Sequence, residues 1–418
     1  MTAASPTVTG SRVLAAVVAL SLGGFGIGVT EFVAMGLLPS IAQDLLPDQW
    51  AASPAVATAT AGHLISAYAL GVVVGAPTLA ALGARSPRKR LLVGFLIGFV
   101  LATALAAVLP SFGLVLAARF VAGLPHGAYF GLASVVASDL LGPGNKGRAG
   151  SFILAGLTIA NVIGVPSITW VGQVAGWRVA YTVVAAVFAV ALVAVVWLVP
   201  HQPASADASV RRELAAFRSV QVWIAIGIGA IGTGGFFAVY SYVSPLVTGS
   251  AGMSLAVVPW ALVVTGVGMT IGNLLGGWLA DRGTGRAILL LGASSAVTLC
   301  LIGLLATNPW GLFGTLLLLG VTSMALAPTV QARLMHAAGE AEGLGASLNH
   351  AAMNIGNALG AFLGGVALAT SGDARSTAWV GLVLGVAGIA LAAVGVRLER
   401  THPVDHHRAP GVELSASE

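Results

Sequence analysis

The sequence predicts an all-α membrane protein whose twelve transmembrane helices form two pseudo-symmetric six-helix bundles. Three observations predict this fold class. First, only 8% of the 418 residues are charged and the mean hydropathy is +0.95, whereas soluble domains carry roughly 25% charged residues. Second, long uncharged apolar runs recur along the whole chain. Third, the two halves of the chain repeat the same glycine and asparagine spacings.

The uncharged runs supply the helices in order, since a helix that crosses a bilayer needs about 20 mostly apolar residues. The first run, after Arg12, is too long for a cleaved signal peptide and is followed by others like it. The runs 219–280 and 287–332 are each long enough for two helices, with turn-forming residues at 248–254 and 307–311. The predicted helices cover residues 13–38, 56–83, 91–109, 112–138, 149–172, 177–199, 221–247, 255–280, 287–306, 310–333, 344–370 and 376–397.

The basic residues predict how these helices are oriented. Most of the 19 lysines and arginines flank the helices on the side that holds both chain ends. The positive-inside rule therefore places both termini in the cytoplasm of a multi-pass protein. The excess of arginine over lysine, with abundant alanine and glycine, suggests a bacterial plasma (inner) membrane. We expect bundles at 1–199 and 221–397, a cytoplasmic linker at 200–220 and a disordered cytoplasmic tail at 398–418.

An internal repeat supports the division into two bundles. Matching spacings occur in the second and eighth predicted helices and in the fifth and eleventh: Gly71-VVV-Gly75 with Gly268-MTI-Gly272, and Asn161-VI-Gly164 with Asn357-AL-Gly360. Repeated halves usually place a substrate site between them, near the middle of the membrane. The alternative is chance, because glycine-rich helices share GxxxG spacings freely.

At this point the sequence resembles a known family. The end of the eighth predicted helix reads Gly277-Trp-Leu-Ala-Asp281-Arg282-Gly-Thr-Gly285-Arg286, which resembles the G-x-L-A-D-R-x-G-R loop motif of the major facilitator superfamily with one extra residue. The segments EFVAMGLLPSIAQDL, RFVAGLPHGAYFG and GVPSITWVGQVAGWR are similar to its twelve-span bacterial drug/proton antiporters, including the sugar-efflux and chloramphenicol-efflux branches. The likeness covers about residues 12–397. The antiporter pattern of the fifth helix ends in Gly-Pro, but here it reads Gly164-Val-Pro166.

The resemblance implies a gate at the cytoplasmic face, in which an acidic residue pairs across the two halves. Its candidate residues are Arg85, Arg88, Asp281, Arg282 and Arg286. The first-half copy of the motif, at residues 84–90, lacks the aspartate. The alternative is that these charges are solvated and act only as topology signals.

Glu31 is the candidate proton-carrying residue. A carboxylate inside an apolar helix costs about 2.5–3.5 kcal/mol, so it usually faces protein or water. Glu31 lies seven residues from the outer end of the first predicted helix, and Arg119 lies seven residues from the outer end of the fourth. Seven residues span roughly 10 Å, so we expect both charges at the same depth. The alternatives for Glu31 are a structural partner of Arg119 or a residue of the outer cavity.

Other polar and aromatic residues in the helices are candidates for the proton pathway and the substrate cavity. His126 lies two helical turns from Arg119 on the same face and could relay protons, bind substrate or pack. His350, Asn354 and Asn357 share one face of the eleventh helix, and interhelical hydrogen bonding is their alternative role. The predicted cavity residues are Tyr129, Phe130, Thr158, Asn161, Phe236, Tyr240, His350, Asn354 and Asn357.

These observations predict a proton-coupled secondary transporter that exports a small molecule such as a drug, sugar or similar metabolite. The alternative is a facilitator or proton symporter that imports a small metabolite, and remoter ones are an intramembrane enzyme or a receptor. We expect no enzyme activity, because HExxH, GxSG and GxGD motifs are absent from the sequence, and no ATP-driven transport by this chain, because a Walker A motif is absent. We also expect no cofactor, no metal and no nucleic-acid partner. The predicted partners are the substrate, protons and the lipid bilayer, and the chain is expected to act as a monomer.

Overall fold

The computed structural model describes residues 10–83, 86–142, 144–202, 219–338 and 342–401. Within these residues the regular secondary structure is entirely helical. The described residues contain twelve helical segments long and apolar enough to cross a membrane, some joining consecutive elements, which confirms the predicted fold class. The predicted linker lies mostly outside the described residues, as does nearly all of the predicted tail, so the exact bundle boundaries stay a prediction.

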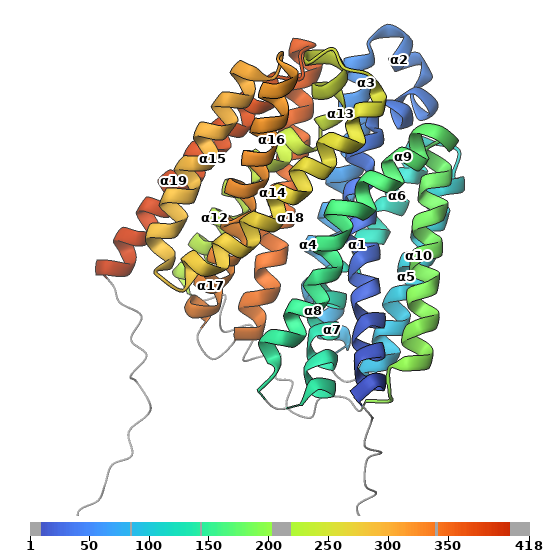
Figure 1. The fold of residues 1–418 in the computed structure, drawn as a ribbon, viewed down its shortest axis with the longest axis vertical. Coiled ribbons are helices and arrows are strands. Elements are labelled where there is room, and N and C mark those ends of the chain that lie inside the picture. Colours follow the sequence, from blue (N-terminus) through green and yellow to red (C-terminus); the bar gives the residue numbers. More distant parts are fainter. Residues whose placement is uncertain (1–9, 84–85, 143, 203–218, 339–341, 402–418) are drawn as a thin grey trace, which may run out of the picture.

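The first bundle contains six spans, some of them built from more than one helical element, and one short helix (Pro47–Ala52) near one face of the molecule. Its elements are α1 (Gly10–Leu45), α2 (Pro47–Ala52), α3 (Pro54–Ala61), α4 (His63–Gly83), α5 (Arg88–Val108), α6 (Phe112–Gly123), α7 (His126–Leu141), α8 (Lys146–Ile159), the π-helix η1 (Ala160–Gly164), α9 (Val165–Ala175) and α10 (Trp177–Leu198). They occupy the blue-to-green half of Figure 1.

The second bundle repeats this pattern in the yellow-to-red half of Figure 1. Its elements are α12 (Val220–Tyr240), α13 (Val243–Pro245), η3 (Leu246–Ser250), η4 (Leu255–Val257), α14 (Val258–Ala280), α15 (Thr284–Leu305), α16 (Pro309–Met324), α17 (Leu326–Ala338), α18 (Glu342–Ser371) and α19 (Ser376–Thr401).

We call the side on which α1 begins and α10 ends the terminal face, and the side that carries α2 and α3 the distal face (Figure 1).

Two of the spans are interrupted where the sequence gives a physical reason. The fourth span breaks between α6 and α7 at Pro125, which has no N–H to donate to the preceding turn. The fifth span contains the π-helix η1, which directly precedes Val165 and Pro166. Such π segments occur mostly as local bulges inside α-helices and are frequent at functional sites.

The internal repeat has the same packing role in both bundles. A Cβ atom at Gly71 of α4 would lie only 2.1 Å from the carbonyl oxygen of Phe120 in α6. At the equivalent crossing in the second bundle, a Cβ atom at Gly268 of α14 would lie 2.3 Å from the carbonyl oxygen of Leu317 in α16. Only glycine permits these close backbone contacts, so the matching spacings mark equivalent helix crossings.

The two bundles contact each other along two seams near the distal face. In one seam α4 and α3 pack on α18, and Ser66 Oγ donates a hydrogen bond to the carbonyl of Ala358 (3.1 Å). In the other, η1 and α9 pack on α14, and Gln173 Nε2 donates to the carbonyl of Leu255 (2.9 Å). The structure therefore shows an arrangement in which the distal side is closed.

An apolar cluster joins the bundles between these seams. It brings Phe32 and Met35 of α1 against Phe236 and Tyr240 of α12 and Leu262 of α14. The Phe32 and Tyr240 rings meet edge to face, with centroids 5.7 Å apart. This inter-bundle cluster begins at the residue after Glu31 and so forms the distal wall beside that carboxyl group.

The outer surface is suited to lipid. Large apolar side chains are exposed along nearly every span, which is unusual for a soluble protein but expected where lipid replaces water. Trp197 and Trp310 are 81% and 87% exposed at opposite ends of their spans, where tryptophan commonly anchors a helix at the membrane surface.

Candidate central site

Glu31 lies in the interior of the protein, where the first bundle meets the second. Its side chain is buried, and its Oε1 accepts a hydrogen bond from Nδ2 of Asn357 in α18 (3.4 Å). This contact crosses from one bundle to the other. A buried carboxylate is costly unless nearby groups compensate its charge, so the neighbours of Glu31 determine what it can do.

Arg119 supplies the compensating charge without touching the carboxylate. Its side chain is buried, and Nη1 donates to the hydroxyl of Thr30, the residue before Glu31 (3.2 Å). The guanidinium lies over the ring of Tyr68 at 4.4 Å and near that of Tyr181 at 5.7 Å. No ion pair within 4.0 Å joins Glu31 and Arg119 in the described part of the chain. The two charges therefore occupy the same region without forming an ion pair.

An aromatic cluster lies on the terminal side of Arg119. It consists of Tyr68, His126, Phe130 and His350. The Tyr68 hydroxyl lies 3.0 Å from Nδ1 of His126, and the Phe130 and His350 rings stack with centroids 5.3 Å apart. His126 and His350 come from different bundles, and their ring centroids are 6.2 Å apart. The cluster thus bridges the bundles between Arg119 and the terminal face.

Several buried polar atoms in this region have no hydrogen-bond partner among the described residues. They are Nε and Nη2 of Arg119, the Tyr181 and Tyr240 hydroxyls, and the Oδ1 atoms of Asn161, Asn354 and Asn357. Leaving such groups unpaired is costly, so these atoms are available to hydrogen-bond to water or to a ligand that enters the site. The set includes donors and acceptors, so it suits a ligand that can both donate and accept hydrogen bonds.

Some predicted cavity residues make other contacts. The Tyr129 hydroxyl donates to the carbonyl of Leu20 (2.9 Å), and the ring belongs to the core of the first bundle. The Thr158 hydroxyl donates to Leu154 within its own helix. Phe236 stacks on Tyr240, with centroids 4.9 Å apart, inside the inter-bundle cluster. Tyr129 and Thr158 thus have their hydroxyls already satisfied by backbone carbonyls.

The predicted gate residues near the terminal face are mostly solvent-exposed. Asp281 is exposed, and its carboxylate makes no hydrogen bond or ion pair with another described residue. Arg282 lies over the ring of Trp278 at 3.6 Å and donates to the Trp278 carbonyl. Arg286 is exposed, and Arg85 lies outside the described residues.

Arg88 differs from the other gate candidates, because it forms an ion pair with Asp139 at the end of α7. This pair lies within the first bundle and joins the start of α5 to α7. Sequence reasoning missed Asp139, since a single acidic residue at the end of a span carries no distinguishing pattern. It also missed Tyr68 and Tyr181, because an aromatic residue in an apolar helix usually only packs.

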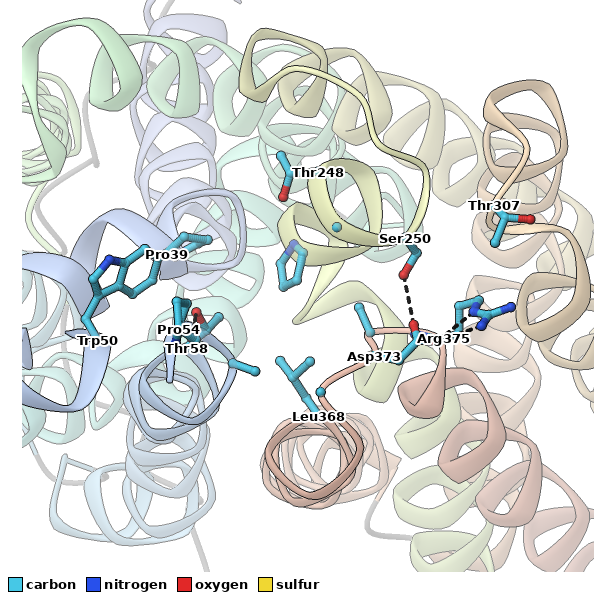
Figure 2. Close-up of a pocket in the computed structure, with 15 residues that line it drawn as sticks. Pro39, Trp50, Pro54, Thr58, Thr248, Ser250, Thr307, Leu368, Asp373 and Arg375 are labelled. Carbon is cyan, nitrogen blue, oxygen red and sulfur yellow. Dashed lines mark hydrogen bonds and ion pairs between the residues drawn. The ribbon is translucent and has the colours of Figure 1, made fainter. Parts of the chain in front are cut away.

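A cavity of about 430 Å³ lies between the bundles at the distal face (Figure 2). Trp50, Pro39 and Leu368 give it an apolar side, and Ser250 and Asp373 give it a polar side. The Asp373 carboxylate accepts hydrogen bonds from Ser250 Oγ (3.2 Å) and from the backbone N–H and side chain of Arg375. Burial raises the pKa of Asp373, but the contacts with Arg375 and Ser250 outweigh it and hold the pKa below its usual value.

Comparison with known proteins places the chain among membrane transporters. A family profile described as "Major Facilitator Superfamily" matches residues 20–258 and 226–418. The chain is 38% identical over 379 residues to the "inner membrane transport protein YdhP" of Escherichia coli K12, covering 90% of this chain and 94% of that one. It is 33% identical over 365 residues to a "chloramphenicol resistance protein" of Streptomyces lividans, covering 86% and 91%.

Solved structures agree on the fold. A bacterial homologue of the human lysosomal transporter Spinster, described as inward-facing and unoccupied, superposes with a TM-score of 0.74 at 15% identity. The match covers 95% of this chain and all of the other. At this level of identity the likeness supports the fold alone.

Proposed function

The chain belongs to the major facilitator superfamily, and from this premise we propose that it exports a small molecule in exchange for protons by alternating access. Its family and its relatives make it a multi-pass transporter of small molecules in the inner membrane. Export, proton coupling, action as a monomer and the placement of both termini in the cytoplasm are parts of the proposal. The positive-inside rule supports the orientation, which would make the terminal face cytoplasmic and the distal face periplasmic.

The observation that carries the proposal is the buried pair of opposite charges at the bundle interface. Glu31 and Arg119 are close enough to influence each other but not joined in an ion pair. Protonation of Glu31 would remove the negative charge and leave Arg119 without compensation. A substrate that donates hydrogen bonds to the ionised Glu31 would therefore compete with the proton for the same carboxylate. Such competition is what exchange requires, because each ligand favours the release of the other.

The contacts between the bundles support alternating access as the transport mechanism. In the distal-closed arrangement the seams of α18 with α3 and α4, and of α14 with η1 and α9, separate the central region from the distal face. Release on that side requires these seams to part while the bundles approach each other at the terminal face. The Asp281 carboxylate is exposed and has no ion-pair partner among the described residues in this arrangement. We propose that it pairs across the bundles in the opposite one, together with Arg282 and Arg286.

The export direction is supported by the relative described as a chloramphenicol resistance protein. Resistance is expected when a compound leaves the cell, and the similarity extends over nearly the whole chain. We propose a substrate of drug or metabolite size that offers both hydrogen-bond donors and acceptors, to match the unpaired groups of the central region.

Transport into everted membrane vesicles tests the proposal. The vesicles come from a strain that lacks its own exporters, and chloramphenicol is the first of a panel of labelled probes. We expect probe accumulation that depends on an imposed proton gradient and disappears with a protonophore. Glu31→Gln should abolish gradient-driven accumulation, whereas Asp48→Asn, at an exposed acid near the distal face, should not. Full coupling in Glu31→Gln, or accumulation only in right-side-out vesicles, would refute the proposal.

A further inference from the structure

We infer that Asn357 is the positioning residue that couples the charge of Glu31 to the contact between the bundles. Its amide donates a hydrogen bond across the interface to the ionised carboxylate, and protonation or substrate binding weakens or replaces this bond. This inference rests on the proposed proton exchange at Glu31. It gives Asn357 a role in coupling, whereas the sequence predicts that it lines the substrate cavity, with interhelical hydrogen bonding as the alternative.

The contact itself differs from the other hydrogen bonds between the bundles. Ser66 and Gln173 donate to backbone carbonyls, whose charge does not change. Asn357 Nδ2 donates to Oε1 of Glu31 at 3.4 Å, which is longer than the roughly 2.7–3.2 Å of most N–H···O hydrogen bonds. It therefore joins the second bundle to the one acidic side chain that is buried at the interface among the described residues. The side chains of Asn357 and Glu31 are 0% and 6% exposed, so bulk water does not replace the bond when it is lost.

The strength of this bond depends on the protonation state of the carboxyl group. A hydrogen bond to a carboxylate is roughly twice as strong as one between neutral groups. Arg119 does not form an ion pair with Glu31, so the amide supplies a direct contact that the arginine does not. Protonation of Glu31 would turn a charge-assisted bond into a neutral one and weaken the link between α1 and α18.

Exchange transport needs such a link, because an empty, deprotonated carrier must not reorient. If it did, substrate would move without a proton in return, and the proton gradient would not drive substrate transport. In the distal-closed structure the ionised Glu31 and Asn357 hold α1 against α18. A proton weakens the bond, and a substrate that hydrogen-bonds to the amide replaces it. Either event permits the bundles to move, which is the rule that an antiporter must obey.

Other titratable groups around Glu31 have to be separated from its effect. They are Arg119 from α6, Tyr68 from α4, Tyr181 from α10 and Tyr240 from α12, with Tyr129 and His126 from α7 and His350 from α18 farther away. The protonation state of tyrosine and arginine side chains ordinarily does not change between about pH 5 and 8, whereas that of histidine does. The Glu31→Gln variant distinguishes the carboxyl group from the two histidines.

The test measures opening of the distal side as a function of pH. The native Cys300 is replaced by serine, and Thr58, which lines the distal cavity, is replaced by cysteine as a reporter. A membrane-impermeant maleimide labels this cysteine when the bundles part. With purified protein in lipid nanodiscs and no substrate, we expect labelling about fivefold faster at pH 5.5 than at pH 8. Glu31→Gln should abolish this pH dependence.

Asn357→Ala should also abolish the pH dependence and should label fast at both pH values. If this variant does not fold, Asn357→Leu keeps the side-chain volume and removes the amide. Ser66→Ala is the matched control, since it removes another bond between the bundles, to the residue after Asn357. It should raise labelling equally at both pH values and keep their ratio.

The outcomes separate the inference from the proposed function. A wild-type pH ratio in Asn357→Ala or Asn357→Leu, together with its loss in Glu31→Gln, overturns the inference alone. A pH ratio that persists in Glu31→Gln, or is absent from the parent protein, overturns the role of Glu31 and the inference with it.

Discussion

Replacing Gly266 by alanine should force the bundles apart on the distal side. Gly266 lies in α14 where it crosses η1, and a Cβ atom there would lie 2.3 Å from the carbonyl oxygen of Asn161 and 2.8 Å from its carbonyl carbon. Both are backbone atoms of a helix, so no side-chain rotation relieves the contact. Relief requires α14 and η1 to separate by on the order of 1 Å, because protein interiors are close-packed.

The size of the effect follows from the cost of overpacking, which is about 1–3 kcal/mol. The contact joins two bundles rather than parts of one, so this cost falls on the distal-closed arrangement and not on the fold of either bundle. A bias of that size changes a conformational equilibrium by roughly 5- to 150-fold. We therefore expect Gly266→Ala to favour the arrangement in which the distal side is open.

The assay is maleimide labelling of the Thr58→Cys reporter in the absence of Cys300. Gly266→Ala should accelerate labelling by at least about fivefold. The control is Gly277→Ala in the same helix, where a Cβ atom would meet nothing within 4 Å. Unchanged labelling in a Gly266→Ala protein that unfolds at the parent temperature would refute the reasoning.

Two further predictions concern the stability of single bundles. Gly71→Ala should lower the free energy of unfolding by about 1–3 kcal/mol, because its Cβ atom would lie 2.1 Å from the carbonyl oxygen of Phe120 in the same bundle. Thermal unfolding in detergent measures this change. The control is Gly94→Ala, where a Cβ atom would meet nothing within 4 Å, and it should leave the stability unchanged or raised. Asp373 has a lowered pKa in the folded protein, so its carboxylate stabilises the fold above the unfolded value of about 3.9 and this contribution is lost as the pH falls through the lower folded value. The loss should be small, because the side chain is 39% exposed and solvent screens its pairing with Arg375. Asp373→Asn should remove this acid-dependent part of the unfolding temperature, and an identical pH profile in parent and variant would contradict it.

Most of the fold could be predicted from the sequence, because hydrocarbon imposes a simple requirement on each span. The predicted first helix, 13–38, falls inside α1 (Gly10–Leu45), which is longer at both ends. Hydropathy finds the apolar part of a helix but not the polar turns that continue it. The predicted fourth helix, 112–138, is divided at Pro125 into α6 and α7. Proline signals such a break, but apolar composition alone does not.

The central site could be predicted only in part. Helix geometry predicts that Glu31 and Arg119 share one depth, and the structure places Arg119 against Thr30, the neighbour of Glu31. Side-chain direction decides whether two such charges touch, and spacing along two separate helices does not fix it. The hydrogen bond from Asn357 to Glu31 could not be predicted either, because it depends on how α18 of one bundle packs against α1 of the other.

The π-helix η1 has a consequence for how the fifth span should be compared with related sequences. Each residue of an α-helix turns the chain by about 100°, so Gly156 and Gly172, sixteen positions apart, would point about 160° away from each other in an unbroken helix. Both nevertheless pack on α1, against Ser21 and Leu37. One residue absorbed in the wider turn reduces their difference to about 60°. The valine between Gly164 and Pro166 thus separates the two residues of the Gly-Pro motif by one position, while the outer half of the span keeps its orientation. Sequence alignments of this span therefore need a gap where the π turn lies.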